Sequence, residues 1–199
     1  MKQPQVFQFK IVLNHVHPSI WRRIVVPSDY TFWDLHVAIQ DAMGWQDCHL
    51  HEFRIDDPRI ESQLSIGIPD EDIVDDPQFL ASWEIAVAEF LSPANSKLLY
   101  IYDFGDWWEH TVTFEELQNS QSLITYPLCV AGERACPPED SGGPHGYQLL
   151  IEAMEDPNHK AHEQYREWIV GEFDAEKFDP AAVEFDDPVA RWNQVFGDK

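Results

Sequence analysis

Apolar side chains alternate with polar ones along two segments near the start of the chain. In residues 6–14, one face of an extended chain carries Phe7, Phe9, Ile11 and Leu13. In residues 20–26, one face carries Ile20, Ile24 and Val26. A period of two residues is typical of a strand with one buried face, so we predict two strands joined by the short segment 15–19.

The period changes to that of a helix in residues 32–43, where Phe32, Leu35, Ile39 and Met43 fall on one stripe. Thr31 precedes this segment and Asp34 follows Thr31 at the spacing of a capping box. Gly44 is the expected C-terminal stop. Residues 49–55 return to alternation and predict a third strand.

The remaining segments have less regular patterns. Residues 56–78 are acidic and rich in proline, which predicts an excursion or long loop. Beyond them we predict a helix over 79–91, strands over 97–104 and 107–115, and an irregular loop over 127–147. Two helices are predicted over about 144–155 and 159–169, the second with Asn158 as its N-terminal cap and Gly171 at its end. A short helix is predicted to begin at Asp179 and Pro180.

The order strand, strand, helix, strand predicts an α+β fold. We expect a mixed or antiparallel sheet with a helix packed across one face, like the ββαβ start of a β-grasp fold. A helical C-terminal part is expected from about residue 144. We expect the chain, residues 1–199, to form a single domain with an acidic excursion at about 56–78.

The charge balance of the chain is strongly acidic. Its 199 residues contain 36 Asp and Glu against 13 Lys and Arg, a formal net charge of −23. Nucleic-acid affinity depends on cations that neutralise phosphates, so a nucleic-acid partner is disfavoured. A solvated acidic surface is one interpretation of this charge, and a basic protein partner or a store of bound cations is the other.

Two further features bear on the compartment. The amino-terminal stretch MKQPQVFQFK has no apolar core, and no segment is apolar over the length of a membrane span, so we expect a cytoplasmic protein with no membrane partner. Cys48, Cys129 and Cys136 are odd in number and lack the spacing of a zinc finger, so we expect free thiols.

Residues 100–110, YIYDFGDWWEH, combine aromatic and charged side chains. Gly105 and Asp106 form a permitted two-residue hairpin turn. In that register Asp103 and His110 are diagonal neighbours on an otherwise apolar face. A structural carboxylate–imidazole pair is one interpretation, because each group satisfies the other. The alternative is that both residues are catalytic.

Two histidines lie at the start of the third predicted strand. His49 and His51 share a side with Phe53 and Ile55. Two histidines at this spacing can ligate a divalent metal ion, with carboxylates or a third histidine such as His110 completing the ligand set. The pattern alone is weak, and histidines that are satisfied in the core or partly exposed are the alternative.

The segment 129–147, CVAGERACPPEDSGGPHGY, is stiffened by prolines and bent by glycines. Glu139 and Asp140 are candidate metal ligands or acid–base groups. The alternative is structural, with Asp140 or Ser141 as the cap of the helix near Pro144. Phosphate-loop, hydrolase and kinase motifs are absent from the sequence.

Together the two segments resemble the plasmid pRiA4b ORF-3-like family. The residues that carry the resemblance are Tyr102, Asp103, Phe104, Gly105, Asp106, Trp108 and His110 in the first segment, and Cys129, Gly132, Pro137, Pro138, Glu139, Asp140, Gly142, Gly143, Gly146 and Tyr147 in the second. The resemblance implies an α+β domain of a kind found on plasmids, in mobile elements and in bacterial and archaeal chromosomes. It implies no particular reaction, cofactor or catalytic residue.

Three functions are consistent with these observations. The first is a binding or protein-interaction module, in which Gly, Pro and aromatic residues shape a rigid groove. The second is a metal-assisted hydrolase that uses Asp103, Asp106, His110, Glu139 and Asp140, together with His49 and His51. The third is a DNA-associated protein of a mobile element. Its only support is that the resembled family occurs on plasmids and in mobile elements, and the acidity of the chain disfavours DNA binding.

Overall fold

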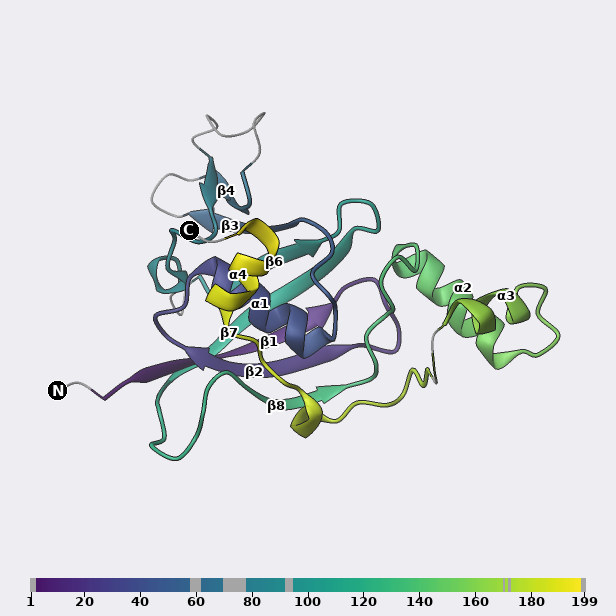
Figure 1. The fold of residues 1–199 in the computed structure, drawn as a ribbon. Coiled ribbons are helices and arrows are strands. Elements are labelled where there is room, and N and C mark those ends of the chain that lie inside the picture. Colours follow the sequence, from purple (N-terminus) through teal and green to yellow (C-terminus); the bar gives the residue numbers. More distant parts are fainter. Residues whose placement is uncertain are drawn as a thin grey trace.

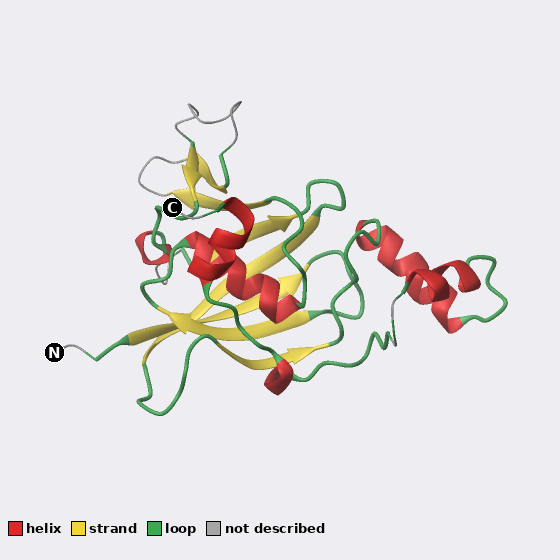
Figure 2. Ribbon diagram, in the orientation of Figure 1, coloured by secondary structure: helices red, strands yellow, loops and turns green. Residues whose placement is uncertain are grey.

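A mixed sheet is the main element of the protein. The computed structural model describes residues 3–57, 62–69, 78–91, 95–169, 171 and 173–197. The described strands are β1 (Gln5–Leu13), β2 (Trp21–Pro27), β3 (His51–Asp57), β4 (Ser62–Gly67), β5 (Phe79–Ala81), β6 (Lys97–Tyr102), β7 (Trp108–Asn119) and β8 (Leu128–Glu133). They form one sheet in the order β5-β4-β3-β6-β7-β1-β2-β8 (Figures 1 and 2). Neighbours are antiparallel except β4 and β5, which are parallel, and with the helices this confirms the predicted α+β fold.

Helix α1 (Phe32–Met43) lies across one face of the sheet (Figure 1). Its start matches the prediction, because the Asp34 amide donates to Thr31 Oγ1 at 3.2 Å and the Thr31 amide donates to Asp34 Oδ2 at 2.8 Å. Its end matches too, with Gly44 in the left-handed region at φ 96°. The strand β3 is separated from β1 by β6 and β7, and the likeness to a β-grasp fold stays a prediction.

The predicted helix over residues 79–91 is wrong. The segment forms β5 and one turn of 3-10 helix, η1 (Val87–Glu89). Between them, the Ser82 carbonyl accepts from the Trp33 amide at 2.9 Å and the Ile85 carbonyl accepts from the Phe32 amide at 3.0 Å. Amides in the first turn of a helix have no partner within it. The turn after β5 supplies those partners for α1, and this tertiary role overrides the helical pattern of the segment.

Two strands lie in segments that were predicted to be loops. In β4, Leu64 and Ile66 are buried and the strand pairs with β3. At the other edge of the sheet, β8 pairs with β2. Both strands are short, and the acids, prolines and glycines around them hide their alternation. Residues 58–61 and 70–77 of the predicted excursion lie outside the described residues.

The C-terminal part is largely helical, as predicted. Helices α2 (Gly143–Glu155) and α3 (His162–Trp168) form an arm beside the sheet, and α4 (Pro188–Phe196) lies over α1 (Figure 1). Helix α3 starts after Ala161 instead of Asn158, and the helix expected at Asp179 is a single 3-10 turn, η2 (Pro180–Ala182). Each helix of the described residues is too short or too polar to cross a lipid bilayer. The three cysteines are free thiols.

Candidate functional site

The hairpin between β6 and β7 has a longer connection than predicted. Tyr102 pairs with Trp108, so residues 103–107 form the connection and the two-residue turn is wrong. Asp103 has a left-handed φ of 57°, and its carboxylate accepts from the Gly105 amide at 2.8 Å. Aspartate tolerates this conformation and can hydrogen-bond the backbone two residues later. The side chain of Asp103 therefore shapes the turn instead of continuing the strand.

This change of register separates Asp103 from His110. His110 pairs with Tyr100, is fully buried, and packs edge-on against Trp45 at 5.3 Å between ring centroids. Neither ring nitrogen of His110 has a hydrogen-bond partner among the described residues. Burial lowers the pKa of His110 to about 3, so the ring is neutral at physiological pH. The predicted Asp103–His110 pair is wrong, and His110 is a core residue.

The aromatic residues of the hairpin divide between core and surface. Tyr100, Tyr102 and Trp108 are fully buried. Phe104 and Trp107, at the end of the hairpin, are 46% and 42% exposed. The aromatic crowding in this segment therefore builds the core on one side and an exposed apolar tip on the other.

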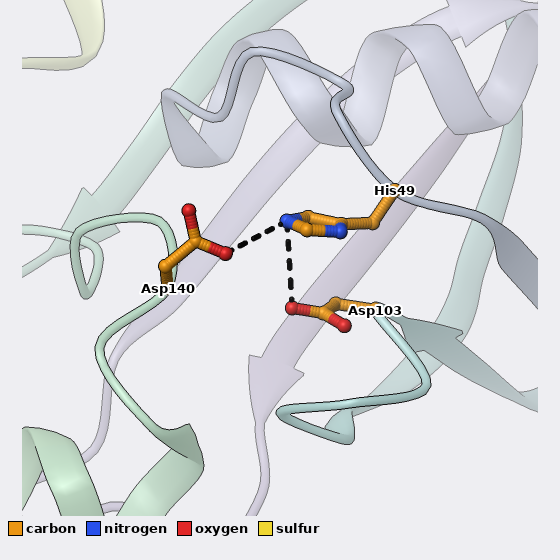
Figure 3. Close-up of side chains that lie close together, drawn as sticks. All are labelled: His49, Asp103 and Asp140. Carbon is orange, nitrogen blue, oxygen red and sulfur yellow. Dashed lines mark hydrogen bonds and ion pairs between the residues drawn. The ribbon is translucent and has the colours of Figure 1, made fainter.

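Three of the candidate residues meet beside the ends of two inner strands of the sheet, β3 and β6 (Figure 3). His49 Nε2 lies 3.1 Å from Asp140 Oδ1 and 3.6 Å from Asp103 Oδ2. One ligand atom from each residue lies within 4.8 Å of the others. The three come from separate parts of the chain: His49 precedes β3, Asp103 follows β6, and Asp140 precedes α2. We call them the His49 cluster. It is open to solvent, since the Asp140 side chain is 72% exposed and that of His49 is 31% exposed.

The backbone of the two motifs holds this cluster together. Asp140, like Asp103, has a left-handed φ, of 53°. The Gly142 amide donates to Asp106 Oδ2 at 2.9 Å. A Cβ on Gly143 would lie 2.4 Å from the Asp106 carbonyl oxygen, so only glycine allows this approach. The N-cap of α2 is Gly142 and makes no side-chain cap hydrogen bond, so the predicted cap by Asp140 or Ser141 is wrong, and Asp106 of the hairpin binds the amide of that N-cap residue instead.

Glu139 connects the second motif to the loop that carries His49. Its Oε1 accepts from the Gln46 amide at 2.8 Å and from the Tyr102 hydroxyl at 3.1 Å. The same hydroxyl accepts from the Cys48 amide at 3.0 Å. Burial raises the pKa of Glu139 above its ordinary value. Glu139 is therefore a half-buried carboxyl that is partly occupied by structural hydrogen bonds.

A groove of about 400 Å³ adjoins Glu139. One wall is made by Trp45, Pro137 and Pro138, and the Trp45 indole donates to the Pro137 carbonyl at 3.0 Å. The other wall includes Trp168 and Phe173 from the helical arm and the segment after it. Trp45, Trp168 and Phe173 were not predicted as site residues. Trp168 and Tyr165 are the two aromatic residues of an otherwise polar helix, and this is the one sequence signal that points to this part of the groove.

The remaining metal candidate, His51, lies in the core. Its ring stacks on His36 at 3.5 Å between centroids and 11° between planes. Burial lowers the pKa of His51 well below its ordinary value. Among the motif residues predicted as structural, Cys129 and Tyr147 are likewise buried. The structure therefore separates His51 and His110 from the His49 cluster.

The chain is similar in sequence and in structure to known proteins. The plasmid pRiA4b ORF-3-like protein family matches residues 5–182 of the chain. The uncharacterized protein y4hQ of Sinorhizobium fredii (strain NBRC 101917 / NGR234) is 36% identical over 195 residues, which cover 94% of each chain. The crystal structure of MM3350, a protein of unknown function from Methanosarcina mazei Go1, aligns with a TM-score of 0.86 and 38% identity, over 92% of this chain and 100% of that chain. Neither relative is described with an activity.

Proposed function

The chain belongs to the plasmid pRiA4b ORF-3-like protein family, and from this premise we propose that it is a binding module with a divalent metal ion at the His49 cluster. The family has no assigned function, so the proposal depends on the site itself. The observation that carries it is the convergence of one imidazole and two carboxylates within 4.8 Å from three separate segments.

The chemistry of the donor set supports a divalent ion. Imidazole nitrogen and carboxylate oxygen are the ligands that Zn²⁺ and similar transition metals take from proteins. Three protein ligands leave coordination positions for water or a ligand, and the exposure of Asp140 keeps them accessible. The metal-free alternative is a direct contact of His49 with the two carboxylates, and metal titration distinguishes the two.

The adjoining groove supports binding as the role of the module. Pro137 and Pro138 stiffen its wall, and Trp168, which is 42% exposed, offers aromatic surface for an apolar side chain of a protein or peptide partner, above the buried Trp45. The net charge of −23 favours a partner with basic residues beside that apolar anchor. A metal ion at the end of the same loop would add a binding point for a carboxylate or carbonyl group of the partner.

A metal-assisted hydrolase is the second candidate, and Glu139 favours it. It follows the groove-lining prolines and precedes the metal-ligand candidate Asp140 in the chain. The His49 cluster would hold the metal ion, which would activate a water molecule, and the half-buried Glu139 carboxyl would be the base for that water. In a hydrolase, Glu139→Gln would keep the metal and lose hydrolysis of test esters and phosphoesters.

The first experiment is a metal titration of tag-free protein. We expect elemental analysis to find stoichiometric metal, or calorimetry to measure binding of Zn²⁺ or Mn²⁺, and we expect the ion to raise the melting temperature. His49→Ala and Asp140→Asn should abolish both effects. His17→Ala, which removes an exposed histidine outside the cluster, is the matched control and should bind like the parent protein. Absence of binding by the parent protein, or equal binding by His49→Ala, would contradict the proposal.

A further inference from the structure

The C-terminal helix α4 is attached to α1 by side-chain contacts. The Trp33 indole donates to the Pro188 carbonyl at 2.9 Å, and Trp192 packs edge-on against Trp33 at 5.1 Å between centroids. The described residues of α4 are all at least partly exposed, so the helix lies on the surface and is not part of the core. It also follows the last residue, 182, of the family match.

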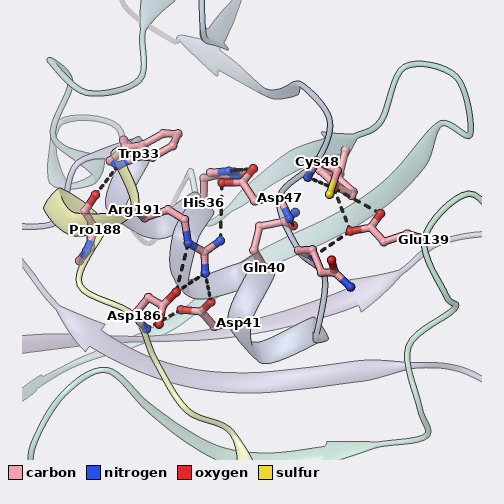
Figure 4. A network of polar contacts seen from close by, with 12 residues as sticks. Trp33, His36, Gln40, Asp41, Asp47, Cys48, Glu139, Asp186, Pro188 and Arg191 are labelled. Carbon is pink, nitrogen blue, oxygen red and sulfur yellow. Dashed lines mark hydrogen bonds and ion pairs between the residues drawn. The ribbon is translucent and has the colours of Figure 1, made fainter. Parts of the chain in front are cut away.

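Arg191 of α4 faces a group of carboxylates beneath it (Figure 4). Its Nη2 lies 2.7 Å from Asp41 Oδ1 and 2.6 Å from Asp186 Oδ2, and its Nη1 lies 3.6 Å from Asp47 Oδ2. The Asp41 and Asp47 side chains are each only 6% exposed. Buried carboxylates need a partner cation, and Arg191 supplies it: it hydrogen-bonds Asp41 and forms a longer ion pair with Asp47, without a hydrogen bond between Nη1 and Oδ2.

Asp47 is held from the other side by α1. The His36 ring places Nε2 at 2.8 Å from Asp47 Oδ1, and the Asp47 amide donates to Gln40 Oε1 at 3.2 Å. The Tyr100 hydroxyl accepts from Gln40 Nε2 at 2.8 Å and lies 2.9 Å from His36 Nδ1, so Gln40, Tyr100, His36 and Asp47 form one hydrogen-bond network. Arg191 thus contacts a carboxylate that this network already positions from the side of α1.

Asp47 also sets the backbone of the loop that leads to His49. Its φ of 58° is left-handed, and the next residue, Cys48, donates its amide to the Tyr102 hydroxyl. His49 follows directly. Metal–ligand distances in a site agree with their ideal values to within about 0.2 Å, so a backbone shift at Asp47 that moves the His49 ring would weaken metal binding.

We infer that the C-terminal segment regulates the His49 cluster, with Arg191 as a positioning residue that acts through Asp47. This inference rests on the metal site proposed above. When α4 is seated, Arg191 holds Asp47 in its left-handed turn and keeps His49 facing the two aspartates. When α4 is displaced, Asp47 turns toward solvent, the loop relaxes and the affinity for the ion falls.

The test compares Zn²⁺ affinity by calorimetry in full-length variants. Arg191→Ala should weaken binding by at least about tenfold, the scale for groups that orient metal ligands. Arg166→Ala, which removes an exposed arginine of α3, is the matched charge control and should have no effect. Val26→Ala, a core truncation in β2, controls for lost stability and should bind like the parent protein. If Arg191→Ala does not fold, Asp186→Asn is the alternative variant, because it removes one ion pair of Arg191 and keeps the arginine. It should lower the affinity for Zn²⁺ by less than Arg191→Ala.

A double-mutant cycle then tests whether Arg191 affects the Zn²⁺ affinity through Asp47. If Arg191 acts through Asp47, adding Arg191→Ala to Asp47→Asn should cause little further loss of affinity. Losses that add in full would overturn the inference, as would unchanged affinity in both Arg191→Ala and Asp186→Asn. Failure of the parent protein to bind Zn²⁺ is a separate result, because it would refute the metal site itself and the regulation with it.

Discussion

Replacing His110 with leucine should raise the free energy of unfolding, and the gain should grow as the pH falls. His110 is fully buried and neither ring nitrogen makes a hydrogen bond of ordinary geometry among the described residues, although the backbone of Tyr100 and Trp108 lies close enough to offset part of the effect of burial on its pKa. An unsatisfied buried polar group costs about 1–3 kcal/mol, and leucine has a similar volume without polar atoms. At neutral pH we therefore expect a gain of about 1 kcal/mol or more, reduced by any misfit of shape.

The pH dependence follows from the lowered pKa of His110. The unfolded chain takes up a proton below about pH 6.5, whereas the folded protein does so only near pH 3. Between these values the unfolded state binds more protons, so stability falls as the pH falls, by about 1.4 kcal/mol per pH unit from this residue. The leucine variant lacks this loss, and its advantage should increase by about 2 kcal/mol between pH 7 and pH 5.

Urea unfolding at about pH 7, 6 and 5 measures both quantities. His51 is also buried and neutral, but it is present in both proteins and cancels in the difference. His145→Leu, the same exchange at an exposed position, supplies the matched control for the substitution itself. The reasoning would be refuted if His110→Leu were less stable than the parent at pH 7, or if the difference between the two proteins did not depend on pH. Either result would mean that the ring nitrogens are hydrogen-bonded or charged in the folded state.

Two further predictions concern the second motif and the cysteines. Gly146→Ala should destabilise the protein by more than about 2 kcal/mol, because the new Cβ would lie 2.0 Å from the Ser141 carbonyl oxygen. Gly44→Ala, where no atom lies within 4 Å of the new Cβ, should cost only about 1 kcal/mol from the left-handed φ, and urea unfolding compares the two. Burial raises the pKa of both Cys48 and Cys136, but Cys48 is the exposed thiol, so a thiol reagent should modify Cys48 first in the folded protein. Equal rates for the two cysteines, measured by mass spectrometry, would contradict this.

Local patterns predicted the elements whose residues need only their sequence neighbours. The capping box of Thr31 and Asp34 and the stop at Gly44 are short-range interactions, and the structure has them where the sequence places them. The alternation in β1 likewise predicted its buried face, which is fully covered at Phe9 and Ile11. Failures occurred where a distant segment decides, as in residues 79–91, which supply carbonyl partners to the start of α1.

The candidate site shows the same division. Its three residues, His49, Asp103 and Asp140, all carry side chains suited to binding a metal ion, and the sequence alone singled each of them out. The hydrolase hypothesis grouped them within a larger set, but the sequence did not separate them from His51 and His110. Asp103 was assigned to a strand over 97–104, whereas β6 ends at Tyr102, and one residue of register moves a side chain to the other face.

The sequence by itself determined the family, the α+β class, the acidic surface and the residue types available for chemistry, because composition and short motifs are local properties. Only the tertiary structure decided which of these residues meet. It placed His51 and His110 in the core, brought His49 to the two aspartates, and set Arg191 above Asp47. These outcomes depend on strand register, on left-handed turns and on contacts between segments far apart in the chain, and their free energies appear only once the chain has folded.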